Sequence, residues 1–198
     1  MRPTTRAGTL LLCFAASCAA LAQSTDLRSP QSFSSIADPA ARARALFVEA
    51  GKVIQSPRCQ NCHPNGDRPT QGDDSHLHLP LVVRGADNLG ATALRCMTCH
   101  QGANFPPAGV PGHPLWQVAP LSMAWQTKSL GQICEQIKDR QRNGGKSLAQ
   151  IQEHMGQDSL VGWAWNPGGN RAPAPGTQAQ FGALIEAWIA GGAACPAS

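Results

Sequence analysis

The chain has 198 residues, a formal net charge of +4 and 14% charged residues. This modest charge excludes a strongly basic nucleic-acid-binding protein, and nothing in it suggests a highly charged membrane surface. The composition is that of a globular domain, and the 20 glycines and 16 prolines indicate long ordered loops.

The first residues have the pattern of a secretory signal peptide. Arg2 and Arg6 precede a short apolar run, and Ala20–Ala22 forms an A-x-A cleavage site. The apolar run is too short to span a bilayer comfortably, and a lipoprotein anchor at Cys18 is an alternative to simple cleavage. Removing the first 22 of 198 residues leaves 176, enough for one domain. We therefore expect a signal peptide at residues 1–22 and a periplasmic protein.

The start of the processed chain predicts a leader followed by a helix. Residues 23–37 are polar and serine-rich without periodicity, which is typical of a flexible segment. Asp38 and Pro39 then match an N-cap followed by proline at the first helical position, and apolar residues follow at helical spacing. We expect this helix to run directly into Cys59, and residues 38–198 to form one domain.

The middle of the chain is expected to be mostly irregular. A Pro- and Gly-rich loop follows the first helix, a short helix is predicted at residues 87–95, and residues 101–120 form another loop. Only residues 79–83 have any strand character.

Further helices are predicted by capping boxes, in which a Ser or Thr cap is followed three residues later by Gln. The three pairs are Ser129 and Gln132, Ser147 and Gln150, and Thr177 and Gln180. The last of these helices has an apolar stripe that must face a core. The sequence therefore predicts a mostly α fold.

Six cysteines remain after the signal peptide, and four of them belong to a repeated motif. The other two are Cys134 and Cys195. Cys134 shares an apolar helix face with Ile133 and Ile137, so it should point inward, where Cys195 could meet it. A disulfide would close a loop of about 60 residues and stabilise the fold by about 4 kcal/mol; two buried free thiols are the alternative.

The repeated motif is Cys-x-x-Cys-His, as CQNCH at residues 59–63 and CMTCH at residues 96–100. Two cysteines on one helical turn can form thioethers with both vinyl groups of a porphyrin, and the following histidine can bind its iron. Zinc knuckles are an alternative, but the gap between the pairs is long and zinc gives the histidines no role. A thioredoxin-like dithiol needs a βαβ pattern, which is missing. A disulfide within each motif would be strained.

With these motifs behind a signal peptide, the chain resembles the dihaem c-type cytochromes. The resemblance implies two covalent haem c groups and a cytochrome c-like domain. The residues that it assigns to covalent attachment are Cys59, Cys62, Cys96 and Cys99, and those that bind iron on the proximal side are His63 and His100.

A second resemblance covers most of the processed chain and rests on the later stretch from PLSMAW at residues 120–125 through residues 154–189. These stretches are similar to exported cytochromes that accompany molybdenum hydroxylases of the isoquinoline 1-oxidoreductase kind. The resemblance implies a molybdenum hydroxylase or another dehydrogenase as electron donor.

The two motifs begin only 37 residues apart, at Cys59 and Cys96. This is too little for a complete monohaem domain around the first haem. Both haems should therefore share one fold and lie close together, so that electrons can pass between them.

The sixth ligand of the first iron is expected from the loop after His63. His78 lies 15 residues beyond His63, and His76 is its near substitute. The alternative is that both are solvated loop histidines.

For the second iron we expect His154, which lies beside apolar residues in a capped helix. A buried histidine bonded to a backbone carbonyl is the competing interpretation. Met123 and Met155 are the alternatives for a His/Met pair, although methionine is more often core packing.

Arginine forks suit haem propionates. The candidates are Arg68, Arg84, Arg95 and Arg171, and the five tryptophans are expected to pack against porphyrin faces.

The function expected is therefore electron transfer rather than catalysis: a dihaem cytochrome that takes electrons from a dehydrogenase and passes them to a further carrier or oxidase. A dihaem enzyme such as a peroxidase is the rival, and a haem-based sensor is a third possibility. Both would need an open iron.

Overall fold

The computed structural model describes residues 26–198, and the signal peptide expected at residues 1–22 lies outside them. The chain is mostly helical. The helices are α1 (Pro39–Ile54), α2 (Pro57–Gln60), α3 (Leu130–Lys138), α4 (Leu148–Gln157), α5 (Ser159–Gly162) and α6 (Gln178–Ala190). Short 3₁₀ helices lie at Pro30–Phe33, Cys96–Thr98, Pro106–Ala108, Leu121–Met123 and Trp163–Trp165.

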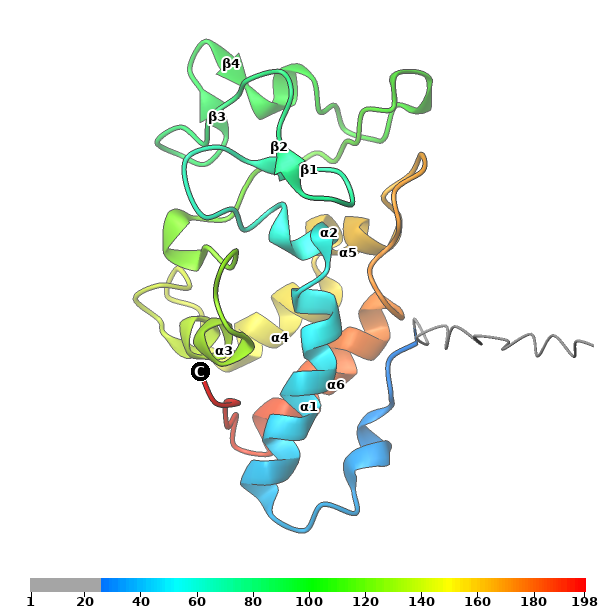
Figure 1. The fold of residues 1–198 in the computed structure, drawn as a ribbon, viewed down its shortest axis with the longest axis vertical. Coiled ribbons are helices and arrows are strands. Elements are labelled where there is room, and N and C mark those ends of the chain that lie inside the picture. Colours follow the sequence, from blue (N-terminus) through cyan, green and yellow to red (C-terminus); the bar gives the residue numbers. More distant parts are fainter. Residues whose placement is uncertain (1–25) are drawn as a thin grey trace, which may run out of the picture.

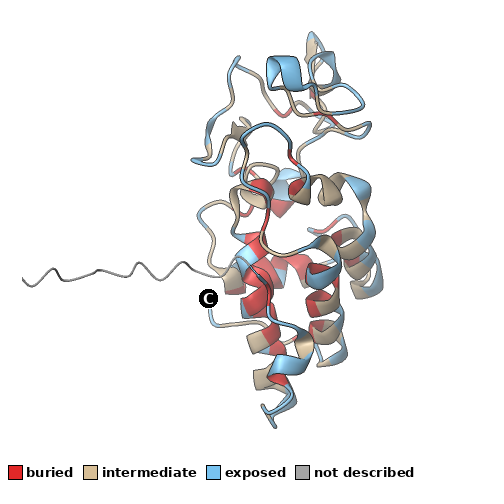
Figure 2. Cartoon of the chain, turned by 90° about the vertical axis from the view of Figure 1, so that its right-hand side faces the viewer, coloured by how far each residue is buried: buried red, intermediate tan, exposed pale blue. Residues whose placement is uncertain are grey.

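The molecule divides into a helical half and a loop half (Figure 1). In the helical half, α6 packs against α1 and α4, and the core includes Phe47, Leu184 and Trp188. The loop half holds two small antiparallel hairpins, β1 (Thr70–Gln71) with β2 (His76–Leu77) and β3 (Gly90–Ala91) with β4 (Leu94–Arg95). Buried residues concentrate in the helical half, as Figure 2 shows.

The helix starts expected from the capping patterns are confirmed. The Asp38 carboxylate accepts hydrogen bonds from the amides of Ala40 and Ala41 at the start of α1. The capping boxes that begin with Ser129, Ser147 and Thr177 are all formed, at the starts of α3, α4 and α6. Each box satisfies backbone donors that a helix end would otherwise leave unpaired.

The first helix does not run into Cys59. α1 ends at Ile54, and the separate helix α2 begins at Pro57. Proline disfavours a helical conformation in the residue before it, and Ser56 is extended, with φ −68° and ψ 153°. The first motif is therefore carried by a second, short helix.

The helix expected at residues 87–95 is also wrong, because the segment forms the β3–β4 hairpin. Asn88 and Gly90 have positive φ angles of 67° and 93°, which a right-handed helix cannot contain. A Cβ added at Gly90 would lie 2.7 Å from the carbonyl oxygen of Leu94, so the turn requires glycine. Residues 79–83 form no strand.

The flexible leader expected at residues 23–37 is not what the structure shows for residues 26–37. Leu27 and Phe33 are buried in the helical core. The Arg28 amide donates a hydrogen bond to the Glu49 carboxylate at 2.9 Å, which joins this segment to α1. The domain therefore begins before Asp38.

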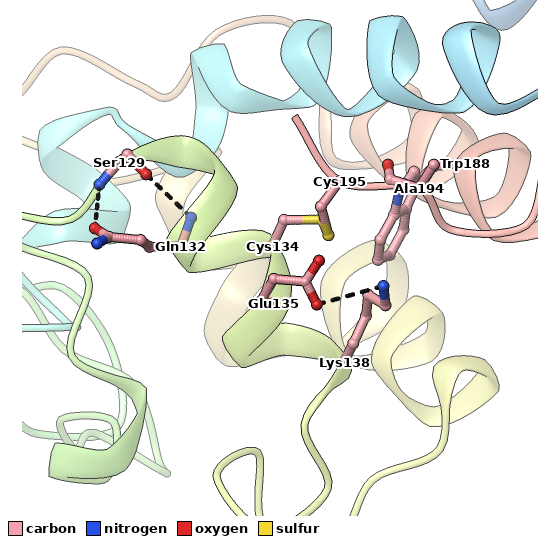
Figure 3. The surroundings of a disulfide bond; sticks show 8 residues. All are labelled: Ser129, Gln132, Cys134, Glu135, Lys138, Trp188, Ala194 and Cys195. Atoms are coloured by element: carbon pink, nitrogen blue, oxygen red, sulfur yellow. Dashed lines mark hydrogen bonds and ion pairs between the residues drawn. A yellow bond between two sulfur atoms is a disulfide. The ribbon is translucent and has the colours of Figure 1, made fainter. Parts of the chain in front are cut away.

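The expected disulfide between Cys134 and Cys195 is confirmed, and it joins α3 to the C-terminal segment (Figure 3). Cys134 is fully buried. The Trp188 indole N–H donates to the Ala194 carbonyl at 3.0 Å, so the same segment is also held to α6. Within residues 26–198, no helix is both long and apolar enough to cross a bilayer.

Replacing both Cys134 and Cys195 with Ala should lower the free energy of unfolding by about 4 kcal/mol, because the unfolded chain regains the freedom that a 61-residue loop removes. Denaturant titration of the oxidised protein and the double variant measures the difference. Selective reduction of this disulfide in the unaltered protein is the control and should give a similar loss. Equal stability of the oxidised protein and the double variant would contradict the expectation.

Candidate functional site

Two adjoining cavities lie between the helical half and the loop half, and each contains one Cys-x-x-Cys-His motif. The first, of about 340 Å³, is lined by Cys59, Cys62 and His63. The second, of about 540 Å³, is lined by Cys96, Cys99 and His100. Both volumes fall in the range of cofactor sites.

The cavities share one wall. The residues that line both are Arg58, Cys62, Gln117, Val118 and Trp163. A ligand in one cavity would therefore lie next to a ligand in the other.

The first motif forms a helical turn at the end of α2. The amides of Cys62 and His63 both donate to the Cys59 carbonyl, at 3.2 and 3.1 Å. A later loop clasps this turn, because the Ala119 amide donates to the Cys62 carbonyl and the Trp125 amide to the His63 carbonyl, at 2.8 and 2.9 Å. This turn places both thiols and the imidazole on the wall of the first cavity.

The His63 ring is held by a hydrogen bond and by stacking. Its Nδ1 lies 2.7 Å from the carbonyl oxygen of Met123. A carbonyl can only accept, so Nδ1 carries the proton and Nε2 keeps a free lone pair. The Trp125 indole stacks on the ring at 3.5 Å with an interplanar angle of 7°. Metal-binding histidines are commonly oriented by such a bond from the other ring nitrogen.

The second motif repeats this arrangement with different residues. The His100 amide donates to the Cys96 carbonyl at 3.0 Å, which closes the turn. His100 Nδ1 donates to the Pro111 carbonyl at 2.7 Å. The Trp116 indole stacks on its ring at 4.5 Å and 14°. Both motif histidines thus have the same tautomer and the same kind of support.

Burial holds these groups in their neutral forms. Desolvation raises the pKa of Cys59 to about 12 and that of Cys62 to about 11, and it lowers the pKa of His63 to about 4. Desolvation also raises the pKa of Cys96 and lowers that of His100. At neutral pH both imidazoles are therefore neutral, which is the form that binds a metal.

α4 supplies two further candidate ligands to the lining of the first cavity. His154 and the buried Met155 both line this cavity. His154 is close enough to lower the pKa of His63. Its Nδ1 lies 3.3 Å from the Asp158 carboxylate, which orients the ring.

The β1–β2 hairpin brings His78 to the second cavity. The rings of His78 and His100 have centroids 5.9 Å apart, at 68° to one another. Two imidazoles that bind one metal from opposite sides, with bonds of about 2 Å, have ring centres roughly 6 Å apart. His78 Nδ1 donates to the Pro80 carbonyl at 3.1 Å, so its Nε2 is also free.

The pairing of distal histidines expected from the sequence is therefore reversed. His78 was expected at the first motif but lies at the second, and His154 was expected at the second but lies at the first. The β1–β2 hairpin follows the first motif in the chain but lines the second cavity. α4 packs on α6, and His154 in α4 lines the first cavity.

The other candidate iron ligands from the sequence are less well placed. His76 lines the second cavity, but it is exposed and bonded to Asp74 at 2.6 Å. Met123 lines the first cavity rather than the second. The Met123 carbonyl accepts the hydrogen bond from His63 Nδ1, so the Met123 backbone lies on the proximal side of the first site.

Among the described residues, 26–198, no group of three or more His, Cys, Asp or Glu side chains could hold a metal ion together. The four motif cysteines do not converge as a zinc knuckle would require. They are free thiols in the structure.

Comparison with known protein families, with curated proteins and with solved structures finds no match. The site's chemistry therefore has to be argued from its own geometry.

Two features that support the motif histidines were not predicted from the sequence. The carbonyl acceptors at Pro111 and Met123 give no sequence signal, because every residue has a carbonyl. Stacking of Trp116 and Trp125 on the motif histidines was expected only as packing against porphyrin. Trp188 lies in the helical core against Phe47 instead.

The arginine candidates have mostly structural contacts. Arg68 donates to the His78 carbonyl, and Arg95 pairs with Asp87. Arg84 is buried and donates to the carbonyls of Pro64, Gly66 and Ala119, which ties the loop after the first motif to the loop that clasps it.

Replacing Arg84 with Gln should therefore loosen the first site. Three carbonyls, those of the buried Pro64 and of the half-buried Gly66 and Ala119, would lose a charged donor, at a cost of about 3 kcal/mol. Thermal or denaturant unfolding measures this loss, with Arg140→Gln on the exposed loop after α3 as a matched control that should leave stability nearly unchanged. Similar stabilities for the two variants would show that Arg84 does not brace the site.

Proposed function

We propose that the protein is an exported dihaem c-type cytochrome that carries electrons. The observation that carries this proposal is the repeated arrangement of the two motifs. In each, the histidine lines a cavity with its Nδ1 bound to a backbone carbonyl, and a second histidine lines the same cavity.

The residues of each cavity fit a haem group. Cys59 and Cys62 would attach one haem, and Cys96 and Cys99 the other, through thioether bonds. The cavity-lining Trp125 has a buried indole N–H without a hydrogen-bond partner among residues 26–198, which suits a ligand that carries acceptors.

The geometry supports one set of axial ligands. His63 and His100 would bind on the proximal sides. His78 would complete the second iron, and the 5.9 Å between its ring and that of His100 supports this assignment. In the first cavity His154 is the preferred distal ligand, because Asp158 orients its ring, and the adjacent Met155 is the alternative.

Haem held in both cavities would supply reversible one-electron chemistry at its iron. The chain's part is to keep the imidazoles neutral, to surround the first site with core residues and to bring the two sites together at one shared wall. We infer that the protein takes electrons from a dehydrogenase, with a molybdenum hydroxylase as the candidate suggested by resemblance, and passes them to a further carrier or oxidase.

A second histidine in each cavity favours a carrier over an enzyme. A dihaem peroxidase needs one iron with an open position, whereas both cavities here contain a candidate sixth ligand. The disulfide supports an oxidising compartment, and together with the signal pattern it supports the periplasm.

The native protein should exceed the mass of its processed polypeptide by two haem groups. Replacing Cys59 and Cys62 with Ala should remove one haem, and replacing Cys96 and Cys99 should remove the other. Mass spectrometry under denaturing conditions measures this, because only covalent groups survive. The Cys134→Ala, Cys195→Ala variant is the control and should keep both. Native protein with fewer than two haems would overturn the proposal.

Replacing His78 with Ala should change the ligation of the second haem alone, and replacing His154 should change that of the first alone. Loss of either histidine leaves one iron without its sixth ligand. The spin state of that haem should rise, and the reduced protein should gain rapid carbon monoxide binding at that haem. Optical spectra report both changes. The controls are His76→Ala and His113→Ala, which should leave both haems unchanged.

Rapid carbon monoxide binding by the unaltered protein would favour the enzyme or sensor instead. Unchanged spectra after His154 replacement, with a change after Met155→Ala, would assign the methionine as the first distal ligand.

A further inference from the structure

Arg58 occupies an unusual position between the two cavities. It lies in α2 directly before Cys59, and only 4% of the residue is exposed. It lines both cavities, and of the five residues in the shared wall it alone carries a charged side chain. Buried arginines normally have a full set of partners.

The hydrogen bonds of Arg58 leave part of its guanidinium unused. Nη2 donates to the Asp73 carboxylate at 2.5 Å and to the Gly72 carbonyl at 2.9 Å. Nε is buried without a hydrogen-bond partner among residues 26–198. An unpaired buried donor is costly. Because Arg58 lines both cavities, a bound ligand is the candidate for the missing acceptor.

The charge on the second cavity's side of Arg58 also favours an anion. Arg171 lines the second cavity with Arg58 and Asp73, and its pKa is lowered first by desolvation and then by the positive charge of Arg58. The second Asp73 oxygen accepts from the Ala172 amide at 3.2 Å. Asp73 pairs with Arg58, and the hydrogen bonds of Arg171 go to backbone carbonyls. The lining near Asp73 thus has two guanidinium groups and one carboxylate, which leaves one positive charge that an anionic group could balance.

This inference rests on the proposed function, because haem carries propionate carboxylates on its edge. We propose that Arg58 binds a haem propionate at the shared wall and that its charge raises the midpoint potentials of both haems. A guanidinium fork suits a carboxylate. Reduction removes one positive charge from a haem, so a nearby cation favours the reduced form. Because Arg58 lines both cavities, its charge acts on both.

The test is a redox titration of the full processed protein with both haems bound. Arg58→Gln should lower both midpoint potentials, and Asp73→Asn, which removes the opposing charge, should raise both. Arg58→Lys keeps the charge and should stay closer to the unaltered protein. The matched control is Arg140→Gln, whose charge is exposed and screened by solvent, and it should move neither potential.

Opposite shifts in the two variants cannot come from a general loss of structure, which has no reason to reverse sign. Unchanged potentials in Arg58→Gln, or a shift at one haem alone, would overturn the inference. If Arg58→Gln does not mature, Asp73→Asn decides, and its failure to raise both potentials overturns the inference equally. Unaltered protein with fewer than two haems would contradict the proposed function and this inference with it, whereas two haems with unmoved potentials contradict this inference alone.

Discussion

Each motif histidine donates its Nδ1 proton to a backbone carbonyl, from Met123 in one cavity and from Pro111 in the other. The acceptors lie 60 and 11 residues further along the chain, so each ring is oriented by a segment outside its own motif. The motif supplies the reactive groups, and the folded loops set their direction and tautomer. For this reason the site depends on the irregular part of the chain as much as on the helices.

The two cavities differ in their surroundings although their motifs match. The first lies against the helical core, with Ile151, Met155 and Phe181 in its lining. The second is lined mainly by loop residues, and Cys99 is exposed there. Burial and solvent access are among the factors that tune haem potentials, so the proposed haems would not be equivalent. The more exposed second site would be the easier one for a partner to approach.

Local features of the fold were predictable from sequence, because they depend on residues close together in the chain. The caps at Asp38, Ser129 and Thr177 are examples, and the cysteine pair was recognised because only two cysteines lie outside the motifs once the expected signal peptide is removed. The distal pairing was not predictable, because it depends on how α4 returns to the first motif through contacts with α6. Residues 26–37 were wrongly predicted to be flexible, because two isolated apolar residues, Leu27 and Phe33, form no periodic pattern.

The loop half has little core of its own. Its strands are two residues long, and Leu79 and Leu81 are largely exposed. Such a region has few internal contacts to resist local opening. If a porphyrin fills the second cavity, it would act as the missing core of this half, and the cofactor would be a structural element as well as a redox centre. The protein would then assemble in two steps. The helical half would fold first, and the loop half would become ordered only when haem binds in the second cavity.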